Sequence, residues 1–142
     1  MNKKEFPGYI MHMINHAFLQ KKNDMLAQYG ITSSQNKVML CLWENDGLSQ
    51  SEILKQIDIK ASSLTKLIEP LEKKNLIKRQ ECFTDCRIKK VYLTDLGKDL
   101  EKKSMEVIYK LEDELIKDFS PEEKKELLNY LNKMLNSIME SR

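Results

Sequence analysis

The fold is decided between residues 48 and 94, where the chain reads LSQSEILKQIDIKASSLTKLIEPLEKKNLIKRQECFTDCRIKKVYLT. Residues 49–52, Ser-Gln-Ser-Glu, have the form of a capping box, which predicts a short helix. A second helix begins at Ala61 or Ser62 after a brief connection. One side of that helix carries an apolar stripe of Leu64, Leu67, Ile68 and Leu71. Two short helices joined by a few residues indicate a helix-turn-helix.

The pattern changes after Asn75. Residues 76–83 and 88–93 are rich in β-branched and aromatic side chains, as strands are. The charged stretch between them, residues 84–87, is typical of a turn. We therefore predict a β-hairpin directly after the helix-turn-helix.

Longer amphipathic helices are predicted before this segment. The first covers residues 4–29 and is stopped by Gly30. A capping box at residues 32–35, Thr-Ser-Ser-Gln, opens a second helix that continues to about Glu44. This second helix is expected to bury Val38, Leu42 and either Trp43 or Met39.

Two further helices are predicted after the hairpin. Thr94 can cap a helix that runs to about Phe119, and Ser120 followed by Pro121 begins another. The expected apolar side of the first is formed by Leu96, Leu100, Val107, Leu111 and Leu115. The last helix is expected to bury Leu127, Leu128, Leu131, Leu135 and Ile138.

Length and composition agree with a mainly α fold that carries a small β-hairpin (α+β). The chain has 142 residues, enough for one domain. It contains only 4 Gly and 3 Pro, which are too few turn-forming residues for a β-sandwich or β-barrel. Its apolar runs are far shorter than a membrane span, and no signal-peptide pattern follows Met1. Three sparse cysteines suit a reducing compartment. We expect a cytoplasmic protein.

The formal net charge of +2 hides an uneven distribution. Residues 48–94 carry ten basic and six acidic side chains, whereas residues 95–142 carry nine and twelve. A basic segment is the electrostatic mark of a nucleic-acid binder, although helical surfaces often show such imbalances.

Residues 48–94 resemble the winged-helix core of the MarR family of bacterial transcriptional regulators. The strongest match is Asp85-Cys86-Arg87 followed by residues 91–97, Val-Tyr-Leu-Thr-Asp-Leu-Gly, which follows the family's wing signature. The order and length of the flanking helices are similar too, so the resemblance covers about residues 4–139. It implies a winged helix-turn-helix at residues 32–94 and a helical dimerisation region at residues 1–31 and 95–142.

The resemblance implies that the second helix of the helix-turn-helix reads the major groove of double-stranded DNA. Its candidate DNA contacts are Ser62, Ser63, Thr65, Lys66 and Lys73. Ser49 and Gln50 lie at the start of the preceding helix, where free amides favour phosphate. For the serines, helix capping is the alternative role, and for the lysines it is a solvated face.

In the family, the wing arginine reaches the minor groove and a carboxylate two positions earlier holds it in place. Arg87 and Asp85 occupy these positions, and Lys89 can add a phosphate contact. The chain departs from the family pattern at Cys86, Ile88 and Pro70. Pro70 falls inside the predicted recognition helix, which it either bends or leaves intact from the solvent face.

The resemblance further implies a homodimer on a near-palindromic site, with a small aromatic or phenolic effector that releases a repressor. Candidate effector-pocket residues are His12, His16, Met39 and Trp43. His12 and His16 also have metal-ligand spacing, but no third ligand accompanies them, so no metal is expected. Catalytic motifs and cofactor motifs are missing from the sequence, so we expect neither enzyme activity nor a cofactor.

Two other functions remain open. Cys82 and Cys86 flank the predicted turn and could form a redox switch in a thiol-sensing regulator of the same fold, whereas Cys41 is expected in the core. Alternatively, the winged fold could serve as a protein-interaction module that does not bind DNA. The basic surface expected from Lys66, Lys73, Arg79, Arg87, Lys89 and Lys90 argues against that module.

Overall fold

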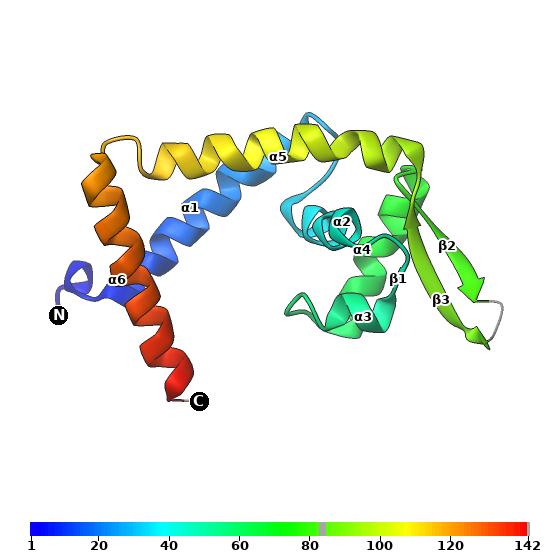
Figure 1. Cartoon of the computed structure of the whole chain (residues 1–142), viewed down its shortest axis with the longest axis horizontal. Helices are drawn as coiled ribbons and strands as arrows, with labels where there is room; N and C mark the ends of the chain where they lie inside the picture. The colour runs from blue at the N-terminus through cyan, green and yellow to red at the C-terminus, as the bar shows by residue number, and fades with distance from the viewer. Residues whose placement is uncertain (83–84, 142) are drawn as a thin grey trace. The chain divides into compact units, whose positions relative to one another are not determined.

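The computed structural model describes residues 1–82 and 85–141, without the side chains of residues 82 and 85–87. The chain divides into two compact units, Met1–Ile108 and a second unit from Tyr109 onward. Figure 1 shows the order of the elements along the chain. The first unit contains the helix-turn-helix and the sheet.

Helix α1 spans Pro7–Ala27 and follows a short 3-10 turn at Lys3–Glu5. The predicted start at about Lys4 was wrong, because the α-helix begins at Pro7. Proline is favoured at this position, since the first amides of a helix have no partner within the helix and proline has no amide hydrogen. Gly30 ends the helix region as predicted, with a φ of 76° that glycine adopts without a steric cost.

Helix α2 spans Ser33–Glu44 and begins with the predicted capping box. The Gln35 amide donates to Thr32 Oγ1, and the Thr32 amide donates to Gln35 Oε1, both at 3.1 Å. Val38, Met39 and Leu42 are fully buried, whereas Trp43 is half-buried. Met39, rather than Trp43, therefore completes the buried face.

Helix α3 spans Gln50–Leu54 and is preceded by a strand that the sequence did not predict, β1 (Leu48–Ser49). A strand of two residues is too short to show an alternating pattern. Leu48 and Ile53, on either side of the helix start, are both buried.

Helix α4 spans Ala61–Lys73 and continues through Pro70, which is half-buried. Pro70 is therefore tolerated within the helix, although it does not lie on a fully solvated face. Asn75 ends the helix in a left-handed conformation (φ 60°), and the Leu76 amide donates to the Leu71 carbonyl at 3.0 Å, which is a Schellman motif. Leu67 is only half-buried, so three of the four residues of the predicted apolar stripe are buried.

Strands β2 (Ile77–Cys82) and β3 (Asp85–Leu93) form the predicted hairpin, and β1 adds a third strand in the order β1-β3-β2. All pairs are antiparallel, with Leu48 opposite Val91 and Arg79 also opposite Val91 on the other side. The predicted turn at residues 84–87 was wrong, because residues 85–87 belong to β3. A register shift follows Glu81.

The core of the first unit lies where α2, α3 and α4 pack beside this sheet (Figure 1). Its fully buried side chains include Val38, Met39, Leu42, Ile53, Leu64, Ile68, Leu71, Ile77 and Val91. These side chains come from every element of the helix-turn-helix and the hairpin, so the core fixes which face of α4 turns outward.

Helix α5 spans Asp95–Leu115 and is capped by Thr94, whose Oγ1 accepts from the Gly97 amide at 3.0 Å. The predicted end at about Phe119 was wrong, because the helix stops at Leu115. The chain then continues in tight turns, one of which is closed by the hydrogen bond from the Ile116 amide to the Asp113 carbonyl. Leu100, Val107 and Leu111 are buried as expected. Leu96 and Leu115 are exposed, contrary to the prediction.

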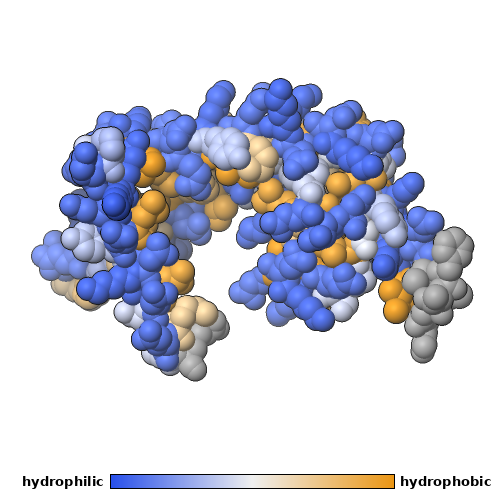
Figure 2. Space-filling view, in the orientation of Figure 1, coloured by the Kyte–Doolittle hydropathy of each residue, from blue (hydrophilic) through white to orange (hydrophobic). Residues whose placement is uncertain are grey.

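Helix α6 spans Pro121–Glu140, and the capping box between Ser120 and Glu123 opens it. Within the single chain the predicted burial is not reached: Leu127 is half-buried and Leu128, Leu131, Leu135 and Ile138 are exposed, because no other described element of this chain covers them. Figure 2 shows apolar surface on this helix among hydrophilic side chains. In the described part of the chain, no helix combines the length and the apolar content that crossing a membrane requires.

Candidate nucleic-acid interface

The N-terminal half of α4 presents a polar, exposed face. Ser62, Ser63, Thr65 and Lys66 are all exposed. The N-cap of the helix is Lys60, which makes no side-chain capping bond, so Ser62 does not cap this helix. Thr65 Oγ1 donates to the Ala61 carbonyl at 3.2 Å and can still accept. Hydroxyl and ammonium groups are thus concentrated where a recognition helix meets base edges.

The opposite side of α4 explains why this face is outward. Leu64, Ile68 and Leu71 are buried at a spacing of three and four residues. Lys73, at the last position of the helix, is exposed as well. The orientation of the polar face is therefore set by the core and not by the polar residues themselves.

Ser49 and Gln50, at the start of α3, are both half-buried. The Ser49 hydroxyl accepts from the Glu52 amide at 3.1 Å. Ser49 also lies opposite Lys90 in the pairing of β1 with β3. Capping is thus an established role of Ser49, and the start of α3 is tied to the sheet.

The hairpin places Lys89 at an exposed position of β3 and Lys90 at a half-buried one. The candidate side chains of Asp85 and Arg87, and those of Cys82 and Cys86, lie outside the described residues. Cα pairing sets Cys82 opposite Asp85 at the end of the hairpin. The wing contact and the redox switch therefore stay predictions.

Arg79 on β2 is bound to Glu72 on α4. Its guanidinium donates to Glu72 Oε1 at 2.9 Å, and its backbone amide donates to Glu72 Oε2 at 3.1 Å. The hydrogen bond from the Arg79 side chain is the main reason that the pKa of Glu72 lies below its usual value. Arg79 consequently adds little free positive charge to the basic surface, contrary to our expectation.

The four candidate effector residues lie in different environments. His12 and His16 are exposed on α1, with stacked rings whose centroids are 6.4 Å apart. Met39 is fully buried, and the indole N–H of Trp43 donates to the Gly97 carbonyl at 2.9 Å. Among the described residues, no cluster of three potential metal ligands occurs.

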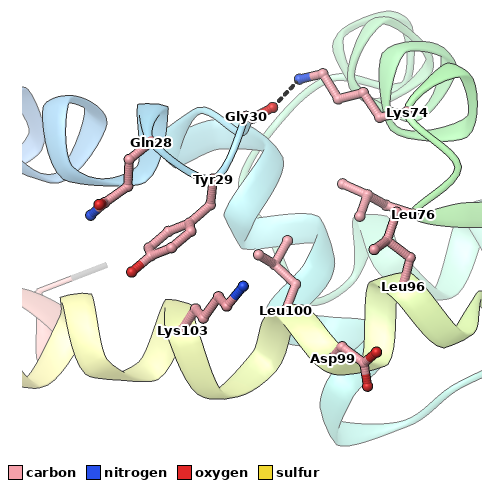
Figure 3. A pocket seen from close by; sticks show the side chains of 9 residues that line it. All are labelled: Gln28, Tyr29, Gly30, Lys74, Leu76, Leu96, Asp99, Leu100 and Lys103. Atoms are coloured by element: carbon pink, nitrogen blue, oxygen red, sulfur yellow. Dashed lines mark hydrogen bonds between the residues drawn. The ribbon is translucent and has the colours of Figure 1, made fainter.

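A pocket of about 400 Å³ lies in the first unit between the end of α1, the end of α4 and the start of α5 (Figure 3). None of the four candidate effector residues lines it. Its lining consists of Gln28, Tyr29, Gly30, Lys74, Leu76, Leu96, Asp99, Leu100 and Lys103. Sequence reasoning missed this pocket because three segments far apart in the chain form it.

Cys41 is buried in the core, as expected. Burial raises the pKa of its thiol, and the charge of Glu44 raises it further. A thiol with a raised pKa stays protonated at neutral pH and is a poor nucleophile. Cys41 is thus a core residue, as its apolar sequence context predicted.

Comparison with known proteins agrees with this geometry. A family model described as MarR family matches residues 31–89. The uncharacterized HTH-type transcriptional regulator YwoH of Bacillus subtilis (strain 168) is 33% identical over 132 residues, which cover 89% of this chain and 93% of YwoH. The chain belongs to the MarR family. Membership confirms the resemblance seen in residues 48–97 and makes the chain a transcriptional regulator and not an enzyme.

Solved structures of the MarR family share the fold. The crystal structure of a MepR–DNA complex from S. aureus has a TM-score of 0.82 at 31% identity and covers 93% of this chain and 98% of MepR. The reduced form of MarR from E. coli has a TM-score of 0.82 at 26% identity and covers 92% and 96%. These similarities confirm a mainly helical winged helix-turn-helix with additional terminal helices.

Proposed function

We propose that this MarR-family chain is a repressor that binds double-stranded DNA sequence-specifically, with α4 in the major groove and the β2–β3 hairpin in the minor groove. The observation that carries the proposal is the exposed polar face at the start of α4, held outward by the buried stripe behind it. The major groove, about 12 Å wide, admits an α-helix. The DNA-bound MepR structure supports the proposal, since MepR is 31% identical to this chain and the match covers 93% of this chain.

The proposed contacts fall into two groups. Ser62, Ser63, Thr65 and Lys66 would meet base edges because they occupy the exposed first turns of α4. Phosphate contacts are proposed for Ser49, Gln50, Lys73 and Lys89, and the resemblance adds Arg87 held by Asp85 in the minor groove. Exposure of Lys73 and Lys89 supports the second group.

We further propose a homodimer whose contacts come from residues 1–31 and 95–142. At the start of α1, the N-cap residue Phe6 and the helical residues Ile10, Met13 and Ile14 are exposed, and α6 exposes Leu128, Leu131, Leu135 and Ile138. Exposed apolar faces of this kind are typical of protein interfaces, and a second copy of the chain would cover them. Two-fold symmetry would then set two α4 helices about 34 to 36 Å apart on a near-palindromic operator in the cytoplasm.

Release of the operator by a small aromatic or phenolic effector is the remaining part of the proposal. An effector acts only if it binds the DNA-competent and the released arrangements with different affinity. His12 and His16 are accessible to such a ligand, whereas the full burial of Met39 permits only an indirect part in binding.

Selection of bound fragments from the genome of the source organism with the purified chain tests the proposal. We expect an enriched near-palindrome whose half-sites are one helical turn apart, and binding that weakens steeply as salt rises. A protein-interaction module without DNA binding would enrich no palindrome and would show no salt dependence. Light scattering of the purified chain should give the mass of a dimer, and a monomer at micromolar concentration would contradict that part.

A further inference from the structure

The hydroxyl group of Thr65 has its hydrogen engaged within α4. Thr65 Oγ1 donates to the carbonyl of Ala61, one turn earlier, at 3.2 Å. A hydroxyl has one hydrogen and two lone pairs, so a hydroxyl that donates inside its own helix can only accept from outside. Thr65 is exposed, which leaves its lone pairs open to an outside donor.

Glu69 is a second acceptor on the same face of α4. It lies four residues after Thr65, one turn along the helix, and is exposed as well. An ionised carboxylate accepts hydrogen bonds and donates none. Among the described residues Glu69 forms no salt bridge. The pKa of Arg79 is raised chiefly by its hydrogen bond to Glu72 and to a smaller degree by the charge of Glu69.

The neighbouring polar side chains have a different hydrogen-bonding capacity. In the part of the chain that the structure describes, the hydroxyls of Ser62 and Ser63 form no hydrogen bond, so each can turn to donate or to accept. Lys66 can only donate. Thr65 and Glu69 therefore stand out on this face as the two groups that can only accept.

The bases of DNA differ in what they offer to such an acceptor in the major groove. Adenine and cytosine present an amino group, at N6 and N4, whereas guanine and thymine present a carbonyl oxygen, O6 and O4. A carbonyl oxygen that faces an acceptor leaves both groups unpaired, which is unfavourable once water is excluded. A carboxylate is suited to cytosine in particular, because adenine has the acceptor N7 beside its amino group.

We propose that Thr65 and Glu69 determine base specificity by selecting amino groups. Thr65 selects adenine or cytosine over guanine or thymine at one position of the half-site, and Glu69 selects cytosine at another. Glu69 also acts against other sequences, since its negative charge is unfavourable in the groove wherever no amino group meets it. This inference rests on the proposed DNA-binding function.

Base substitutions in the operator test the proposal. The operator fragment enriched in the genomic selection is synthesised with each of the four bases at every position of one half-site. Fluorescence anisotropy then gives the affinity of the purified chain for each fragment. At one position we expect adenine or cytosine to be bound roughly three- to tenfold more tightly than guanine or thymine, and at a second position we expect a similar preference for cytosine.

Variants assign each preference to its residue. Thr65→Val keeps the shape of the side chain but lacks the hydroxyl, so the first preference should disappear, whereas Thr65→Ser should keep it. Glu69→Gln supplies an amide, which binds N6 and N7 of adenine, so the second preference should move from cytosine to adenine. Ser63→Ala is the matched control: it removes an exposed hydroxyl of the same helix and should leave both preferences in place.

Three results would overturn the inference. The wild-type chain could show no preference for amino groups, Thr65→Val or Glu69→Gln could keep the preference assigned to its residue, or both variants could lose the same affinity for every sequence. The last result would indicate a structural role. Each of them leaves the proposed function in place, because the operator is still bound. Failure of the selection to enrich any operator would instead contradict the proposed function and this inference with it.

Discussion

Glu72 of α4 binds both the side chain and the backbone of Arg79 of β2. The guanidinium donates at 2.9 Å to Oε1, and the amide donates at 3.1 Å to Oε2. One carboxylate thereby joins the helix proposed to enter the major groove to the first strand of the hairpin proposed to enter the minor groove. Their relative position is held by a pair that is itself partly exposed.

Glu72→Gln keeps an acceptor for the Arg79 amide but removes the charge. Because exposed ion pairs contribute little, we expect the free energy of unfolding to fall by only about 0.5–1 kcal/mol at pH 7. Urea denaturation measures the change, with Glu101→Gln, an exposed residue of α5, as the control. A larger loss in the control than in Glu72→Gln would contradict this role.

The difference in unfolding free energy between the wild-type chain and Glu72→Gln should depend on pH. The pKa of Glu72 is lowered in the folded chain, chiefly by the hydrogen bond from the Arg79 side chain. A carboxyl whose pKa is lower when folded stabilises the fold above its unfolded pKa, and this stabilisation is lost as the pH falls through the folded pKa. The difference between wild type and Glu72→Gln should therefore be complete at pH 7 and shrink below about pH 4.3. A stability difference that grows as the pH falls would contradict this role of the Glu72 carboxylate.

Gly97→Ala should destabilise the junction between the hairpin and α5. A Cβ added at Gly97 would lie 2.1 Å from the backbone oxygen of Leu76, which no side-chain movement relieves. We expect a loss of about 1–3 kcal/mol and a changed emission of Trp43, whose indole is bonded to Gly97. Gly8→Ala is the control, because nothing lies within 4 Å of its added Cβ and helix propensity favours alanine.

Asn75 ends α4 in a left-handed conformation. Alanine at this position pays the steric cost of that conformation, so Asn75→Ala should lose about 1–2 kcal/mol of unfolding free energy. Asn75→Gly should lose none, since glycine adopts this conformation freely. Equal losses in the two variants, measured by thermal denaturation, would show that the Asn75 side chain matters more than its backbone.

Ser104→Ala tests a buried polar contact between α5 and α2. Ser104 Oγ donates to Asn36 Oδ1 at 2.6 Å, and among the described residues Asn36 Nδ2 has no partner. Removing the hydroxyl leaves a fully buried amide with no bond at either end, which should cost about 1–3 kcal/mol. Ser137→Ala, which removes an exposed hydroxyl on α6, should change stability by less than about 0.5 kcal/mol.

Local signals in the sequence were sufficient for most of the fold. The capping box at Thr32, the helix start at Ser120 and Pro121, and the stop at Gly30 depend on residues within a few positions of one another, and each prediction was confirmed. Strand β1 was missed because its two residues become a strand only by pairing with β3. The hairpin turn was misplaced for a related reason: charged residues 85–87 are typical of turns, yet they pair as a strand.

Burial and site geometry depend on contacts that the sequence does not show. The apolar stripe of α6 predicted a helix correctly but its burial wrongly, because periodicity cannot tell whether the chain itself covers a face. Arg79 was grouped with free cations because Glu72 lies seven residues away and on another element. The apolar stripe of α4 predicted which face of this helix is exposed, but the role of that face in DNA binding comes from the resemblance and stays a proposal.

The most direct test of the central claim is a salt titration of operator binding by the wild-type chain, Lys66→Ala and Lys102→Ala. Both lysines are exposed, but only Lys66 lies on the polar face of α4. If α4 reads the major groove, Lys66→Ala should lower operator affinity by about 1–3 kcal/mol at physiological salt, whereas Lys102→Ala should bind like the wild type. Equal affinities of all three proteins at every salt concentration would contradict the claim that this face of α4 contacts DNA.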